Sequence, residues 1–397
     1  MLNLGLFIPE LTLAITALAI ILFDLFVERK GWLVAVSLIG LIIAAGSLVV
    51  TPGSPAQTIF NNMLVVDGFA FFFKLLFLGI SALVILASTD YVSKFTNFRG
   101  EYYALVILST LGMMLMAATS ELVTIYISLE LTSISLYVLA GFLKDSKSTE
   151  ASLKYLLLGA ISSAVLLFGM ALVFGSTGQT QLGQIAGSVA SLSATGVMAN
   201  PALVLGIVLL VAGFGFKVAA FPFHMWVPDV YEGAPTPVVA FLSVGSKAAG
   251  FALILRVFST AFGFTDWLSI NFGLVFAGLA AIGMFVGNLS ALPQTNIKRM
   301  LGYSSIAQAG YLMVGLATMG ISPPADILGQ SGVLFFLAGY ALANLGTFTA
   351  IIAISNKLDS DFIQDYSGMI KRAPVLTLAL SLCLISLIGM PPAAGFM

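Results

Sequence analysis

Charged residues, cysteine and histidine are all scarce in this sequence of 397 residues. Asp, Glu, Lys and Arg make up only 8% of the chain, and Cys383 and His224 are its one cysteine and one histidine. Such a small supply excludes a disulfide framework, a cysteine-ligated iron–sulfur cluster, a structural zinc site and bis-histidine haem. We therefore expect no cofactor and no metal in this chain, so that any electron transfer takes place in a partner.

Two further absences narrow the choice of function. The net charge is −1, which leaves no basic face for a nucleic acid. The sequence also lacks a G-x-x-x-x-G-K-[ST] phosphate-binding loop, so ATP is not expected to be the energy source. The remaining sources of energy are an ion gradient and coupling to a partner protein.

What the sequence has in abundance is apolar residues. They make up 59% of the chain, and the mean hydropathy is +1.08, which is typical of a polytopic membrane protein. Runs near the roughly 20 residues needed to cross hydrocarbon recur about twelve times, and lipid admits them only as helices or closed barrels. The first run lacks a cleavage signal and is expected to stay in the bilayer. The predicted helical spans are 6–26, 32–50, 68–88, 102–119, 122–142, 154–174, 202–223, 237–257, 269–288, 300–319, 329–355 and 374–397.

Basic residues gather in alternate connections between these spans, which predicts an outside N-terminus by the positive-inside rule. The connections 1–2, 3–4, 5–6, 9–10 and 11–12 contain Arg29, Lys30, Lys94, Arg99, Lys144, Lys147, Lys298, Arg299, Lys357, Lys371 and Arg372. Two places depart from this alternation. Connection 7–8 holds only Asp229 and Glu232, and Arg256 lies at the outer end of span 8. Acidic groups near the mouth of a pathway can concentrate cations, so we expect a functional reason for these departures.

Two of the spans contain helix-breaking residues. Span 7 is expected to break at Gly213, Gly215 and Pro222, and span 12 at Pro391 and Pro392. Breaks at corresponding positions indicate inverted transporter repeats. The expected division is a three-helix bundle over 1–100, a first five-helix repeat over 101–260 with spans 4 to 8, and a second repeat over 261–397. The second repeat is expected to be incomplete, because the sequence stops soon after its break.

Three ionisable residues lie near the middle of their spans: Glu130, Lys217 and Lys247. A lysine at this depth costs about 2.5–3.5 kcal/mol on insertion scales, so it needs a partner, water or a function. Lys247 has ten residues on each side within its span, about 15 Å, and cannot easily reach either surface. An adjustable distance between Glu130 and Lys217 would change their affinity for a proton. The alternative is a static ion pair that holds two helices together.

Other polar residues have less specific interpretations. His224 titrates near neutral pH and suits a proton relay, although a histidine at a helix end is equally often structural. Lys74 is close enough to the end of its span to snorkel, and we interpret it as structural rather than functional. We interpret Glu10, Asp24 and Asp67 as interfacial groups. Uncharged polar side chains that could support a water wire, or join helices by hydrogen bonds, are Ser128, Ser133, Ser243, Ser246, Ser305, Gln308 and Asn344.

Several stretches of the sequence carry a resemblance to a known family. They are ELVTIYISLELTSISLYVLAGF (121–142), GFGFKVAAFPFHMWVPDVYEGAPTPVVAFLSVGSKAAGFALILR (213–256), TNIKRMLGYSSIAQAGYLMVGL (295–316) and LSLCLISLIGMPPAAGF (380–396). The chain resembles the antiporter-like proton-translocating subunits of respiratory complex I, and among them the subunit N branch with its photosynthetic NDH-1 counterpart. That family shares ancestry with Mrp-type cation/proton antiporters.

The resemblance implies an all-α fold of fourteen helices with broken helices 7 and 12. It implies that Glu130 is the fifth-helix glutamate, Lys217 the broken-helix lysine that pairs with it, and Lys247 the eighth-helix lysine that passes the proton on. His224 corresponds to a histidine beside that path, and the exit lysine would follow Met397. The implied partners are the other membrane subunits of the complex, with NADH, flavin, iron–sulfur clusters and quinone in partner subunits.

The same resemblance implies a bacterial plasma membrane or a thylakoid as the location. Two alternatives remain at this point. The first is a monovalent cation/proton antiporter subunit of the Mrp type. The second is a passive membrane scaffold that anchors other subunits.

Overall fold

The computed structural model describes residues 4–27, 31–50, 56–92, 98–193, 200–262, 266–319 and 328–396, and for residues 4, 193 and 266–271 it describes the backbone only. Within these ranges ten helices are long and apolar enough to cross a membrane. The all-α membrane fold expected from the apolar runs is thus confirmed. Of the predicted loop cations, Arg29, Lys30 and Lys94 lie outside the described residues, as does Met397.

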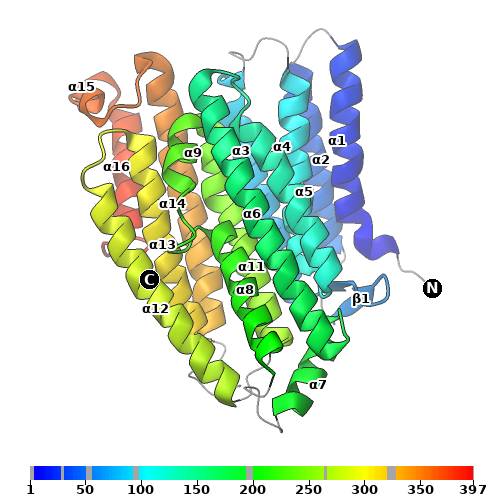
Figure 1. Ribbon diagram of the computed structural model, residues 1–397. Coiled ribbons are helices and arrows are strands. Elements are labelled where there is room, and N and C mark those ends of the chain that lie inside the picture. Colours follow the sequence, from blue (N-terminus) through cyan, green and yellow to red (C-terminus); the bar gives the residue numbers. More distant parts are fainter. Residues whose placement is uncertain are drawn as a thin grey trace.

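The helices run side by side in one bundle (Figure 1). Their bounds are η1 Leu4–Phe7, α1 Ile8–Phe26, α2 Gly31–Val50, α3 Gly68–Ser88, α4 Arg99–Ala118, α5 Leu122–Ala140, α6 Ser146–Thr177, α7 Leu182–Ser193, α8 Pro201–Val218, α9 Val227–Gly233, α10 Thr236–Phe241, the π-helical turn η4 Leu242–Ser246, α11 Lys247–Thr260, α12 Asp266–Ala291, α13 Ile297–Met319, α14 Leu328–Leu358, η5 Ile363–Tyr366, α15 Met369–Arg372 and α16 Pro374–Ile388.

Two short elements between the spans were not predicted from the sequence. Strands β1 (Gln57–Ile59) and β2 (Leu64–Val66) form an antiparallel hairpin that pairs Thr58 with Val65. The hairpin and α7 lie at the lower end of the bundle in Figure 1, hereafter the hairpin end, and α15 lies at the opposite end, the α15 end. Because strands of three residues carry almost no periodic signal, hydropathy alone could not reveal them.

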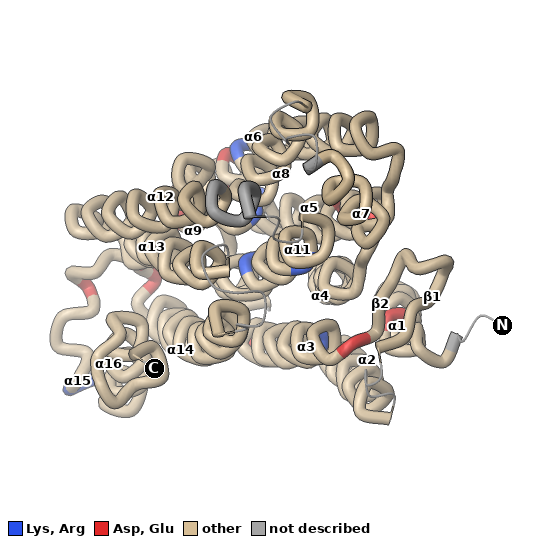
Figure 2. Tube along the Cα trace, turned by 90° about the horizontal axis from the view of Figure 1, so that it is seen from below, with Lys and Arg blue, Asp and Glu red and all other residues tan. Residues whose placement is uncertain are grey.

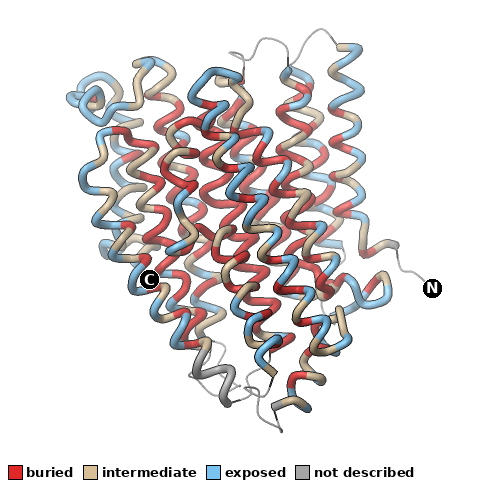
Figure 3. The backbone as a smooth tube through the Cα atoms, viewed as in Figure 1, coloured by how far each residue is buried: buried red, intermediate tan, exposed pale blue. Residues whose placement is uncertain are grey.

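Burial is concentrated in the middle of the bundle, while the outer helices present apolar side chains outward (Figure 3). Outward-facing residues such as Ile42, Ile161 and Phe285 are 69%, 63% and 71% exposed, as expected where lipid replaces water. The segment Thr236–Thr260, which comprises α10, η4 and α11, is buried throughout its most apolar window. This helix therefore makes its contacts with protein, and it carries Lys247.

The predicted break in span 7 lies later than the glycines suggested. Helix α8 continues through Gly213 and Gly215 to Val218, and the chain leaves the helix at Ala219, which has a left-handed φ of 60°. The two glycines instead allow close packing, since a Cβ on Gly213 would lie 2.6 Å from Leu166 Cβ. Pro222 does lie in the non-helical segment before α9. Pro391 and Pro392 likewise follow the end of α16 at Ile388.

Candidate functional site

Glu130 lies near the middle of α5, and its carboxylate is held by a serine of the neighbouring helix. Ser163 of α6 donates a hydrogen bond to Glu130 Oε1. Ser133, one turn further along α5, falls on the same helix face as Glu130 because residues three apart are neighbours on a helix surface. An acid and a hydroxyl thus face the same space between α5, α6 and α8.

Lys217, in the last turn of α8, points into that space. Its side chain is 4% exposed, and its ammonium donates a hydrogen bond of 2.9 Å to Ser133 Oγ. Both residues of the expected pair are thereby described, and they do not form a direct ion pair. Lys217 instead bonds the serine one turn from Glu130, so a change of side-chain rotamer would bring the two charges together. Glu130 and Lys217 thus lie near each other, and in this structure the lysine bonds the Ser133 hydroxyl.

Gly250 of α11 packs against the aliphatic stem of Lys217. A Cβ at position 250 would lie 3.3 Å from Lys217 Cγ and 2.6 Å from Val218 Cγ1. Gly250 is one turn after Lys247 on α11. The close approach of α8 and α11 at Gly250 therefore places Lys217 and Lys247 about one turn apart along the direction of the helices. The absence of a side chain at Gly250 allows the two helices to approach this closely.

The substitution Gly250→Ala tests this close packing. We expect it to destabilise the protein by about 1–3 kcal/mol, because an added methyl group in a tight site forces its neighbours to shift. The matched control is Gly79→Ala in α3, where no atom lies within 4 Å of the added Cβ; it should be neutral or slightly stabilising. The measurement is the midpoint of thermal unfolding in detergent. Equal midpoints for the two variants would contradict the packing argument.

Lys247 begins α11 directly after the π-helical turn η4, a distortion that often marks functional sites. Its side chain is 3% exposed. The ammonium donates to the Ser305 carbonyl and, at 2.6 Å, to Ser305 Oγ on α13. That hydroxyl also lies 3.0 Å from the Tyr231 hydroxyl of α9, and the Tyr340 ring of α14 lies 5.6 Å from the ammonium. The lysine is thus coordinated by neutral oxygen atoms and an aromatic ring, without a carboxylate partner among the described residues.

Polar groups continue from Lys247 towards α14 and α16. Tyr340 donates to the Ser243 carbonyl at 3.2 Å, and Asn344 donates to Ser243 Oγ at 2.6 Å. Gln308 of α13 donates to the Leu387 carbonyl at the end of α16, at 2.8 Å. Five of the residues predicted to support a polar path therefore bond residues of other helices, and with Glu130, Lys217 and Lys247 we call them the polar row: Ser133, Ser243, Ser305, Gln308 and Asn344.

The structure does not join the other predicted residues to this row. Ser128 hydrogen-bonds the carbonyls of its own helix, and Ser246 is buried beside Lys247 in η4. The half-buried His224 stacks on Phe221 at 5.4 Å, and its Nδ1 forms no hydrogen bond with the described residues. Its assignment to a proton relay stays a prediction.

Sequence reasoning missed three residues of the site: Ser163, Tyr231 and Tyr340. Each lies on a helix other than that of its partner, which is Glu130 for Ser163, the Ser305 hydroxyl for Tyr231 and Lys247 for Tyr340. Serine and tyrosine are also common in membrane helices. No local pattern could have singled them out without knowledge of which helices pack together.

The acidic connection before span 8 has a structural explanation. Asp229 lies 2.7 Å from both Lys154 and Arg299, and Glu232 lies 3.0 Å from Arg299 and 2.9 Å from Lys147. Burial alone would raise the pKa of Asp229, but hydrogen bonds from Lys154 and Arg299 outweigh it and lower that pKa overall. These residues line a cavity of about 180 Å³ between α6, α9 and α13. Bases from α6 and α13 therefore balance these two acids, and the expected functional reason for the acidic connection stays a prediction.

The second departure, Arg256, also has a partner. Its guanidinium forms two hydrogen bonds with Asp67, at 2.6 and 3.0 Å, and a third with the Ala117 carbonyl at 2.7 Å. Asp67 also caps α3 by accepting a hydrogen bond from the Ala70 N–H. Arg256 thus joins the end of α11 to α3 and α4. Its charge is balanced by Asp67 within the protein, so a position at the outer end of span 8 does not require contact with water.

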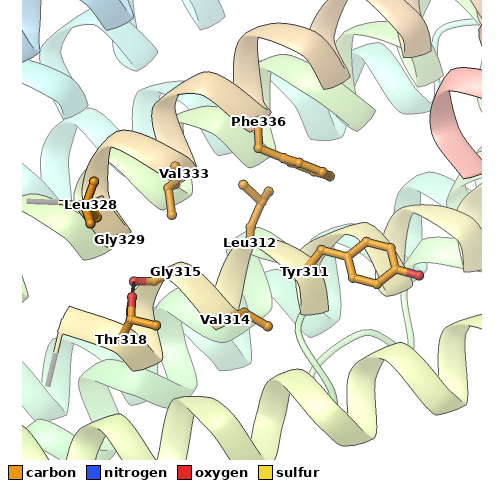
Figure 4. Close-up of a pocket in the computed structure, with 10 residues that line it drawn as sticks. Tyr311, Leu312, Val314, Gly315, Thr318, Leu328, Gly329, Val333 and Phe336 are labelled. Carbon is orange, nitrogen blue, oxygen red and sulfur yellow. Dashed lines mark hydrogen bonds between the residues drawn. The ribbon is translucent and has the colours of Figure 1, made fainter. Parts of the chain in front are cut away.

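A separate groove of about 450 Å³ lies between α13 and α14 and contains none of the predicted residues (Figure 4). Apolar side chains such as Leu312, Val333 and Phe336 line it, together with glycines. Its threonine, Thr318, donates its hydroxyl hydrogen to the Gly315 carbonyl of its own helix. The residues described along this groove therefore offer no charged group to an ion.

Buried lysines and a glutamate that face one another across a polytopic helical bundle, beside a broken helix, define the class: an ion-translocating membrane protein. The chain belongs to the family described as NADH:quinone oxidoreductase/Mrp antiporter, transmembrane, whose model matches residues 118–397. The resemblance seen in the sequence is thereby confirmed. No group of three or more His, Cys, Asp or Glu side chains suited to a metal occurs among the described residues.

Individual relatives agree with this assignment. The chain is 51% identical to NADH-quinone oxidoreductase subunit N of Dehalococcoides mccartyi, over 99% of this chain and 81% of the relative. It is 44% identical to NAD(P)H-quinone oxidoreductase subunit 2 of Microcystis aeruginosa, over 100% and 75%. A chain of respiratory complex I from Thermus thermophilus matches with a TM-score of 0.78 and 34% identity, over 98% and 80%. The Mrp complex of a Dietzia species shares the fold, with a TM-score of 0.82 and 22% identity, over 99% and 73%.

Proposed function

We propose that this chain translocates protons across an energy-transducing membrane as a subunit of an NADH-quinone oxidoreductase. Quinone reduction in partner subunits drives the movement, and the chain itself carries out no redox chemistry. Moving one charge through a potential of 100 mV requires about 2.3 kcal/mol, which the coupling must supply for each proton at such a potential.

The observation that supports this proposal is the hydrogen bond of the buried Lys217 to Ser133, close to Glu130 on α5. In the present arrangement its ammonium bonds the neutral Ser133, one turn from the Glu130 carboxylate. A rotation towards Glu130 would pair the charges and strengthen the hold on the proton, whereas a return to Ser133 would weaken it. Lys247, with only neutral ligands around it, is the acceptor to which a weakly held proton passes.

This function also implies which partners the chain has, how it is oriented and which membrane contains it. The partners are the other membrane subunits of the complex, and the NADH, flavin, iron–sulfur and quinone sites lie in partner subunits. The hairpin end faces outside and the α15 end faces inside, in agreement with Lys371 and Arg372 at α15. The membrane is a bacterial plasma membrane, or a thylakoid if the complex is of the NDH-1 type.

Proton movement in the absence of sodium tests this function. We expect inverted vesicles that contain the assembled complex to take up protons during NADH-driven quinone reduction, at the same ratio of protons to quinone with and without sodium. Proton exchange that requires sodium and proceeds without NADH would favour the antiporter. A Lys247→Ala complex that fails to assemble, but whose remaining assembled fraction pumps at the normal ratio, would favour the scaffold.

A further inference from the structure

The structure contains a second buried acid–base pair, on helices that do not carry Glu130, Lys217 or Lys247. Lys74 Nζ of α3 lies 2.6 Å from Glu10 Oε1 in the first turn of α1. The two side chains are 2% and 1% exposed. Snorkelling of Lys74 and an interfacial position of Glu10 are therefore wrong, because protein buries both side chains, whereas a structural role for Lys74 stays open.

Stability alone is a weak explanation for such a pair. Apolar residues of similar volume are often as stable as a buried ion pair, and ionisable groups inside a membrane are rare and usually functional. Glu10 is also incompletely coordinated, since Oε1 has the Lys74 ammonium as its partner while Oε2 forms no hydrogen bond with the described residues. The Glu130 carboxylate, by contrast, accepts such a bond from Ser163. Buried polar atoms without a protein partner call for a proton or water to satisfy them.

Lys74 of α3 is the ionisable side chain that pairs with Glu10, while the described elements that pack most closely on α1 are α2, α4 and η1. Helix α2 contains no ionisable residue, and η1 contains none either. The ionisable residues of α4, which are Arg99, Glu101, Tyr102 and Tyr103, lie in its first two turns, at the end of the bundle remote from Glu10. The charge of Glu10 therefore depends on Lys74 and on water or protons that reach the pair from the hairpin end.

Asp67, which precedes α3 at the hairpin end, is the partly exposed charged residue closest in sequence to Lys74. It lies seven residues before Lys74, which places the two residues on the same face of the chain as it enters α3, and it is 22% exposed. Burial would raise the pKa of Asp67, but the bonds and charge of Arg256, the Ala70 N–H and the charge of Lys74 lower it overall. Charged segments of α1, α3 and α11 lie near one another in the view along the helices (Figure 2).

We propose that Glu10 and Lys74 form a proton-binding site that exchanges protons with the aqueous phase at the hairpin end by way of Asp67. In its unloaded state the site is the ion pair of the present structure. In its loaded state Glu10 is a neutral carboxylic acid beside the Lys74 ammonium, and the added proton comes from water at Asp67 and returns there. Among the described residues, the hydrogen-bond and ion-pair partners of these three side chains, which include Arg256 and the Ala70 N–H, do not include Glu130, Lys217 or Lys247.

Labelling of the intact complex with dicyclohexylcarbodiimide, which modifies protonated carboxyl groups in membranes, tests this site. The complex is held in vesicles with the hairpin end facing the medium, and modified peptides are quantified by mass spectrometry. We expect modification of Glu10 to rise several-fold as the medium changes from mildly alkaline to mildly acidic. The matched control is Glu121, which is 5% exposed at the same end and accepts hydrogen bonds from Thr124; its modification should stay low throughout.

The variant Lys74→Met shows whether the reagent reaches the site. Without the ammonium, Glu10 should be protonated and modified at every pH tested. Once this access is shown, wild-type modification that is absent or does not change with pH would overturn the proposal and leave a static ion pair. The labelling is read without turnover, so its outcome does not depend on whether the chain pumps protons.

Discussion

Replacing Lys217 by alanine should abolish proton translocation in the assembled complex, or reduce it at least tenfold per quinone reduced. The substitution removes the one ammonium that can alternate between Ser133 and the space beside Glu130. It also removes a charge from a site that protein encloses. The measurement is the ratio of protons moved to quinone reduced in reconstituted vesicles, together with the amount of assembled complex.

The matched control for this variant is Lys357→Ala, which removes an exposed lysine in the last turn of α14. It should pump at the wild-type ratio. A Lys217→Ala complex that assembles and pumps at that same ratio would show that the buried ammonium is a static contact. Glu130→Gln should give the same defect as Lys217→Ala, since either change removes one charge of the same pair.

Replacing Arg256 by alanine should prevent stable assembly of the chain. The guanidinium is 10% exposed and makes three hydrogen bonds to Asp67 and Ala117. Its loss leaves a carboxylate and a carbonyl without their partner, and breaking such a pair costs about 3–5 kcal/mol when it is fully buried. Because Asp67 is 22% exposed, we expect the lower end of that range. This is still a large fraction of the few kcal/mol that hold a typical domain together.

The measurement is the amount of chain recovered in the assembled complex and its midpoint of thermal unfolding. Arg372→Ala is the matched control, because Arg372 is exposed at the α15 end. The double variant Arg256→Leu with Asp67→Asn should recover part of the loss, since it leaves no buried charge unpaired. Normal recovery of Arg256→Ala alone would mean that the end of α11 is held by apolar packing.

Much of the helical framework could be predicted from the sequence, because the run of apolar residues that crosses a membrane is long and unambiguous. Helices α2 and α3, at 31–50 and 68–88, agree with the predicted spans to within a residue. The bounds of α6 were less accurate, because its polar first turns from Ser146 carry no hydropathy signal. The division into three domains stays a prediction, and α3 packs on α10, α11 and α14 as well as on its neighbours in sequence.

The site was predictable only in part, and the reason is again physical. An isolated charge in an apolar run is conspicuous, so Glu130, Lys217 and Lys247 could be found from the sequence. The partners of a charge depend on which helices meet, and that depends on packing between residues far apart in the chain. Hence Asp229 and Glu232 could not be known to face bases of α6 and α13, nor Lys74 to face Glu10.

The central claim is that the buried lysines exchange protons during turnover, and the variant Lys247→Met tests it most directly. Methionine fills a similar volume without a charge, so the contact with α13 near Ser305 is kept while the proton acceptor is lost. The measurement is the number of protons moved per quinone reduced by the intact complex in sealed vesicles. If the lysine accepts protons, the assembled complex will show a ratio well below that of the wild type. An unchanged ratio in an assembled Lys247→Met complex would contradict the claim.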